Sequence, residues 1–257
     1  MAGKSLVNSY YDQGPSYSYF EGCSTGGRQG LMEAQRYPND FDGIVAGAPA
    51  YAYQALNAAG TWNLQRIFRD NLVGNLAVDT TGDGEFDSLR LIDVLHEKVL
   101  DACDAGDGIS DGIVSDPNSC EFSPERDLAP LKCPTGAGSD SCFTDAQIQT
   151  INDFYAGPRD DNGIQVYPGK TLGSELRWTG LYVPHAGNSN GPSKLTGVAG
   201  DHMNYLFYED DPGVTIPNVR DHLYQARKTG AFPEFSWMEF DINDFTSGKG
   251  ALMMSIT

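Results

Sequence analysis

Residues 17–30 read YSYFEGCSTGGRQG, and this stretch decides the expected fold. Its first part, YSYF, combines aromatic and hydroxyl side chains in a way that is typical of a strand. Its second part opens a helix that we expect to end at Pro38. A short apolar run at residues 44–48 predicts a second strand, parallel to the first across the helix. The order strand, helix, strand indicates an α/β protein.

Ser24 lies at the predicted strand-to-helix turn, within the pattern G-C-S-T-G. This pattern at such a turn predicts a nucleophile elbow, in which a strained serine lifts its Oγ clear of the sheet. The residues two before and two after the serine must then be small. The backbone N–H of Thr25 would point at the same space and stabilise an oxyanion. An ordinary glycine-rich turn is the alternative interpretation.

The composition excludes some partners. The chain has 257 residues, enough for one large domain or a domain with a big insertion, and its formal charge is -18. Such a charge repels nucleic acid and anionic lipid, so we expect neither as a partner. No apolar run approaches the roughly 18 residues that span a bilayer. The N-terminus has no signal-peptide pattern.

Five cysteines are present, and four of them fall between Cys103 and Cys142 in loop-rich sequence. Clustered cysteines in such sequence predict disulfides and an oxidising compartment, so we expect a secreted or periplasmic protein. Zinc binding is the alternative, which the absence of any C-x2-C pair disfavours. The fifth cysteine, Cys23, has no partner in the cluster and adjoins Ser24.

After residue 50 the sequence no longer alternates between strand and helix patterns. Residues 88–103 predict an amphipathic helix with one apolar stripe, made of Leu91, Leu95, Val99 and Ala102. A capping box at Thr144 predicts a helix through Tyr155, and residues 219–228 predict a short one. We therefore expect three regions: part of an α/β core at 1–52, an inserted lid at 53–240, and a return to the core or a tail at 241–257.

Acidic residues follow the helix at 88–103. Asp104, Asp107 and Asp111 are separated by glycines, and such a set can wrap a hard cation such as Ca²⁺. A solvated acidic loop is the alternative. A second acidic run, at residues 79–87, has Arg90 where an EF-hand loop needs a bidentate glutamate. We interpret that second run as a plain loop before the helix.

A serine hydrolase also needs a histidine as general base. Of the four histidines, His96 falls within the amphipathic helix and is interpreted as a surface or packing residue. The other three, at positions 185, 202 and 222, lie in lid-like sequence, and none occupies a strand-end loop after an acid. None is therefore expected to be the base.

Three stretches together resemble the tannase and feruloyl esterase family. They are YSYFEGCSTGGRQGLMEAQRYPNDFDGIVAGAPA, CDAGDGISDGIVSDPNSCEF and YPGKTLGSELRW. The resemblance implies an α/β-hydrolase with a large disulfide-stapled lid that cleaves esters of aromatic acids such as gallate or ferulate. It implies Ser24 as nucleophile and the Thr25 N–H as oxyanion donor. It also implies a structural calcium ion, whose ligands are the side chains of Asp104, Asp107 and Asp111 and the carbonyls of Ile109 and Ile113.

The resemblance further implies the disulfides Cys103–Cys120 and Cys133–Cys142. In the family, the cysteine before the nucleophile is bonded to one directly after the catalytic histidine, and Cys23 fills the first role. No His-Cys dipeptide occurs in the chain, and no family acid follows. The chain is thus expected to be an internal fragment, with the base and acid beyond Thr257. The alternative to a serine esterase is a non-catalytic, calcium-stabilised relic or binding module.

Overall fold

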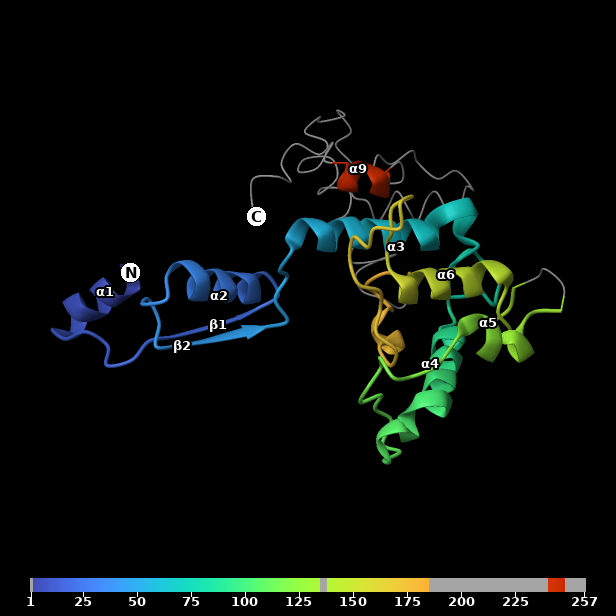
Figure 1. Cartoon of the computed structure of the whole chain (residues 1–257), viewed down its shortest axis with the longest axis horizontal. Coiled ribbons are helices and arrows are strands. Elements are labelled where there is room, and N and C mark those ends of the chain that lie inside the picture. Colours follow the sequence, from blue (N-terminus) through green and yellow to red (C-terminus); the bar gives the residue numbers. More distant parts are fainter. Residues whose placement is uncertain (1, 135–137, 185–239, 248–257) are drawn as a thin grey trace. The chain divides into compact units, whose positions relative to one another are not determined.

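The computed structural model describes residues 2–134, 138–184 and 240–247 and divides into two compact units (Figure 1). The first unit is Met1–Leu56 and the second is Asn57–Thr257. The first contains α1 (Ala2–Tyr11), β1 (Tyr19–Cys23), α2 (Thr25–Arg36) and β2 (Gly43–Gly47). Helix α3 (Tyr53–Leu72) begins in the last residues of the first unit and continues into the second.

The first unit forms the predicted strand–helix–strand arrangement. Strands β1 and β2 are parallel, with Tyr19 opposite Gly43 and Cys23 opposite Gly47. Helix α2 ends at Arg36, just before Pro38, because proline disfavours a helical conformation in the residue that precedes it. A Cβ built on Gly30 of α2 would lie 3.2 Å from Ile44 Cγ2, so a small residue brings the helix close to the sheet.

The second unit packs three longer helices around its core (Figure 1). These are the C-terminal part of α3, α4 (Arg90–Cys103) and α6 (Asp145–Ala156). Fully buried side chains on them include Leu64, Ile67, Leu91, Leu95, Ile151 and Phe154. The shorter helices are η1 (Asp104–Asp107), α5 (Pro124–Asp127), η2 (Ala129–Leu131), η3 (Glu175–Arg177) and α9 (Ile242–Thr246).

Helix α3 was not predicted from the sequence. Its central turns are buried on all sides, and two of the buried residues, Thr61 and Asn63, are polar. A helix that is buried all round shows no alternation of apolar and polar faces, so the periodic signal used to predict helices is lost. Tertiary packing, rather than an amphipathic pattern, stabilises this helix.

The two predicted helices of the second unit are present, with one correction. In α4, Leu91, Leu95 and Val99 are buried as expected, but Ala102 is exposed. Cys103 continues the buried stripe instead, because it follows Val99 by four residues and is turned inward. The capping box at the start of α6 is complete, since the side chains of Thr144 and Gln147 each accept a backbone N–H. The helix predicted at residues 219–228 lies outside the described residues.

Candidate functional site

Ser24 has a strained backbone at the junction of β1 and α2. Its φ of 60° and ψ of -114° are unusual for a residue with a side chain. Its N–H donates to the carbonyl oxygen of Gly47 at 3.1 Å, and its own carbonyl accepts from the N–H groups of Arg28 and Ala50, each at 3.0 Å. These three backbone hydrogen bonds, to Gly47, Arg28 and Ala50, hold Ser24 in its strained conformation. The residue is exposed.

Glycines around Ser24 allow the tight turn, but not all at the predicted positions. A Cβ on Gly22 would lie 2.5 Å from the backbone of Gly26, so Gly22 must stay small, as predicted. A Cβ on Gly26 would meet no described atom within 4 Å, so the prediction for that position is wrong. The constraint falls on Gly27, whose Cβ would lie 2.3 Å from the Gly47 carbonyl oxygen.

Thr25 is the first residue of α2, a helix of 12 residues. The N–H groups of a helix's first turn have no intrahelical acceptor, so the Thr25 N–H is available to a ligand next to Ser24. The helix dipole places partial positive charge at the same end. This end of the first unit thus combines an exposed hydroxyl with an N–H donor, an arrangement that can bind a carbonyl oxygen and stabilise it as it gains negative charge.

No acid–base partner of Ser24 is found in the part of the chain that the structure describes. The Ser24 hydroxyl makes no hydrogen bond to a described residue. Three of the four histidines, at positions 185, 202 and 222, lie outside the described residues. Cys23, next to the serine, is a free and exposed cysteine.

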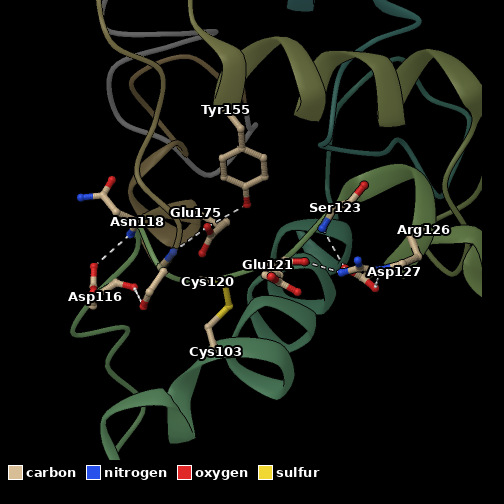
Figure 2. Close-up of a disulfide and its surroundings, with 12 residues drawn as sticks. Cys103, Asp116, Asn118, Cys120, Glu121, Ser123, Arg126, Asp127, Tyr155 and Glu175 are labelled. Carbon is tan, nitrogen blue, oxygen red and sulfur yellow. Dashed lines mark hydrogen bonds and ion pairs between the residues drawn. A yellow bond between two sulfur atoms is a disulfide. The ribbon is translucent and has the colours of Figure 1, made fainter.

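His96 belongs to a buried network in the second unit. Its Nδ1 lies 2.7 Å from Glu175 Oε2, and the Glu175 side chain is fully buried. The other carboxylate oxygen of Glu175 accepts from the Tyr155 hydroxyl at 2.8 Å (Figure 2). The same oxygen also accepts from the Gly173 N–H at 2.8 Å. Burial and the adjacent carboxylate both raise the pKa of Tyr155 above its usual value, so its hydroxyl remains a donor. His96 therefore packs, as predicted, and its ring contacts a buried carboxylate.

Sequence reasoning missed Glu175. The residue is 79 positions away from His96, and an acid in irregular sequence carries no signal of burial.

The acidic residues of the predicted calcium loop make hydrogen bonds to backbone N–H groups. Asp104 Oδ1 accepts from the N–H groups of Asp111, Gly112 and Ile113 at 3.1–3.3 Å. Asp107 accepts from Ser115 and from the Ile109 N–H, which lowers its pKa from the usual value. Among the described residues, no group of three or more acidic, histidine or cysteine side chains is arranged to hold a metal ion. Calcium binding by this loop stays a prediction.

Both predicted disulfides are present. Cys103 at the end of α4 is bonded to Cys120, and Cys133 is bonded to Cys142 (Figure 2 shows the first). Each bond closes a loop of the second unit, and the first joins the acidic loop at both ends. The described helices include none that is long and apolar enough to cross a bilayer.

Comparison with known proteins identifies the family. The family model described as "Tannase and feruloyl esterase" matches residues 1–207, which is most of the chain. The chain belongs to the tannase and feruloyl esterase family. Among curated members of the tannase and feruloyl esterase family, it is 32% identical over 260 residues to "Probable feruloyl esterase B-1" of Aspergillus terreus, covering 98% of this chain and 44% of that protein. It is 37% identical over 186 residues to "Feruloyl esterase B" of Aspergillus niger, covering 71% of this chain and 32% of that protein.

Two solved structures have a similar fold. Feruloyl esterase B from Aspergillus oryzae matches with a TM-score of 0.62 and 28% identity, over 97% of this chain and 45% of that one. Tannin acyl hydrolase from Aspergillus niger matches with a TM-score of 0.58 and 19% identity, over 98% of this chain and 42% of that one, a likeness of fold. The chain thus spans less than half the length of these similar proteins.

Proposed function

We propose that this chain carries the nucleophile of a carboxylic ester hydrolase that acts on esters of aromatic acids such as ferulate or gallate. The observation that carries the proposal is the strained, exposed Ser24 between β1 and α2, with the Thr25 N–H beside it. The names of the family members, feruloyl esterase and tannin acyl hydrolase, support this class of substrate.

In the proposed reaction, Ser24 Oγ attacks the carbonyl carbon of the ester while its proton passes to a general base. The Thr25 N–H stabilises the resulting oxyanion. The bond between the carbonyl carbon and the alcohol oxygen then breaks, the alcohol leaves with a proton, and an acyl-serine remains. Water attacks this acyl-serine, so that the aromatic acid is released and the Ser24 hydroxyl is restored. The general base is proposed to lie outside the described residues.

The first unit is proposed to be part of an α/β-hydrolase core, and the second a lid that supplies the pocket for the aromatic acid. The core of packed helices and the two disulfides of the second unit support its assignment as a stable inserted domain. Disulfides also support secretion or a periplasmic location. A structural calcium ion at Asp104, Asp107 and Asp111 is part of the proposal. The backbone N–H groups that these carboxylates accept all bond to Oδ1, and an ionised carboxylate has a second oxygen that can bind a cation.

Acylation of Ser24 tests the proposed function. The chain is incubated with an activated aryl ester, such as a 4-nitrophenyl ester of an aromatic acid, and the acyl group is located by peptide mass spectrometry. Because oxyanion stabilisation and binding accelerate the reaction even without the base, we expect the acyl group on the peptide that contains Ser24. Ser24→Ala should abolish this acylation.

Ser9→Ala is the matched control, because Ser9 is an exposed serine on α1 of the same unit. It should be acylated like the unmodified chain. Acylation that persists at an equal level in Ser24→Ala would overturn the nucleophile assignment and favour a non-catalytic binding module.

A further inference from the structure

The second unit contains a pocket of about 370 Å³, and all of the residues that line it belong to that unit. It is lined by the end of α6 and by two chain segments, 117–124 and 168–172. Its walls are mainly apolar, and they include Pro117, Phe122, Pro124, Tyr155, Pro168 and Leu172. The volume falls within the range of about 300–1,000 Å³ that is usual for small-molecule sites.

The walls of the pocket are fixed by specific contacts. The Tyr155 hydroxyl donates to Glu175, so its ring cannot turn away (Figure 2). The ring packs edge-to-face against Phe122, with centroids 6.2 Å apart. The disulfide between Cys103 and Cys120 ties the first segment to α4. A Cβ on Gly169 would lie 1.8 Å from the Tyr155 carbonyl oxygen, so only glycine allows the second segment to approach α6 this closely.

Lys170 is the charged residue among those that line the pocket. Its Nζ donates to the Tyr182 hydroxyl at 2.6 Å and lies 4.0 Å from the centroid of the same ring. Within the described ranges it makes no ion pair with a carboxylate. An ammonium has three N–H donors, so it retains donors for a ligand. Burial lowers the pKa of Lys170 to about 8, because the ammonium loses water that would stabilise its charge. A bound anion would stabilise the charged ammonium in place of that water.

We propose that this pocket, the Lys170 pocket, binds a small aromatic carboxylate. The aromatic ring would lie against Phe122 and Tyr155, and the carboxylate would pair with the Lys170 ammonium. A single negative charge fits better than several, because the chain as a whole carries a formal charge of -18. The proposal does not depend on Ser24, because it is argued from residues of the second unit alone.

Benzoate and benzamide test the proposal, since they have nearly the same shape but only benzoate is charged. Binding to the chain is measured by NMR titration at pH 7. We expect saturable benzoate binding, with the largest shifts at Phe122, Tyr155 and Leu172, and about tenfold weaker binding of benzamide because the charge-assisted pairing is lost. Titration of the Ser24→Ala chain should give the same result, because the proposed binding does not use the Ser24 hydroxyl.

Lys170→Met should weaken benzoate binding to the level of benzamide, whereas Lys170→Arg should restore it. Lys98→Met is the matched control, because Lys98 is an exposed lysine of α4 that pairs with Asp101. It should leave binding unchanged. If Lys170→Met does not fold, the benzoate and benzamide comparison on the unmodified chain still decides. Equal affinities of the two compounds, or benzoate shifts confined to the Ser24 region, would overturn the proposal.

Discussion

Glu175 Oε2 lies 2.7 Å from His96 Nδ1, and this contact joins α4 to the segment that contains η3. The carboxylate is completely buried and accepts two further hydrogen bonds, from Tyr155 and Gly173. A buried carboxylate is tolerated only when its oxygens have such partners. The network therefore positions α4, α6 and the wall of the Lys170 pocket relative to one another.

Glu175→Ala should strongly destabilise the second unit. The change leaves the Tyr155 hydroxyl and the Gly173 N–H as donors that have lost their acceptor, and each buried donor left unsatisfied costs about 1–3 kcal/mol. Urea unfolding followed by circular dichroism measures the loss. Asp101→Asn, which breaks the exposed pair with Lys98, is the control and should leave the midpoint unchanged. Similar midpoints for the two variants would contradict the structural role of Glu175.

Gly27→Ala should disrupt the first unit, whereas Gly26→Ala should not. A Cβ on Gly27 would lie 2.3 Å from the Gly47 carbonyl oxygen and 2.8 Å from Pro49 Cα, both of which are backbone atoms. Overpacking of this kind costs about 1–3 kcal/mol or more. Gly26→Ala places its methyl group in open space and raises helix propensity by up to about 1 kcal/mol.

Hydrogen exchange of the α2 amides distinguishes the two glycine variants. We expect faster exchange in Gly27→Ala and unchanged or slower exchange in Gly26→Ala. Equal exchange in both would mean that α2 does not depend on its close approach to Gly47.

Calcium should raise the melting temperature of the chain if the proposed metal site forms. A ligand that binds only the folded state at 100 times its Kd stabilises that state by about 2.7 kcal/mol. Thermal unfolding is compared with and without CaCl2 after treatment with a chelator. Asp104→Asn should remove the effect, whereas Asp83→Asn, in the acidic run interpreted as a plain loop, should retain it. A melting temperature that calcium does not change would contradict the site.

Lys170 should lose its proton at an unusually low pH. Burial lowers its pKa from 10.5 to about 8, whereas the hydrogen bond to Asp101 raises the pKa of Lys98. Reductive methylation with ¹³C-formaldehyde, followed by NMR, measures the titration of each amine, and Lys170→Arg assigns the signal. We expect Lys170 to titrate well before Lys98; the reverse order would contradict the burial.

The same shift in pKa has a consequence for stability. Between about pH 8 and 10.5 the unfolded chain retains the Lys170 proton that the folded chain has released. The contribution of this residue to the free energy of unfolding should therefore increase as the pH rises through that window. Comparison of unfolding curves of the unmodified chain and Lys170→Met over this window measures that contribution.

The amino-acid sequence by itself determined the local features. The aromatic run before Ser24, the glycines after it and Pro38 predicted β1, α2 and their order, because turn and helix-end chemistry depends on neighbouring residues. The capping box at Thr144 started α6 for the same reason. The disulfide pairing came from a resemblance over a long stretch, which the family comparison confirmed.

The tertiary structure alone decided which residues meet across long separations. It buried Thr61 and Asn63 in α3, paired His96 with Glu175, and moved the steric constraint of the elbow from Gly26 to Gly27. It also placed Lys170 next to Phe122 and Tyr155 in one pocket. Such contacts depend on how whole elements pack against one another, which no local sequence pattern specifies. The packing decides which groups are buried, and the loss of water around a buried group then shifts its pKa.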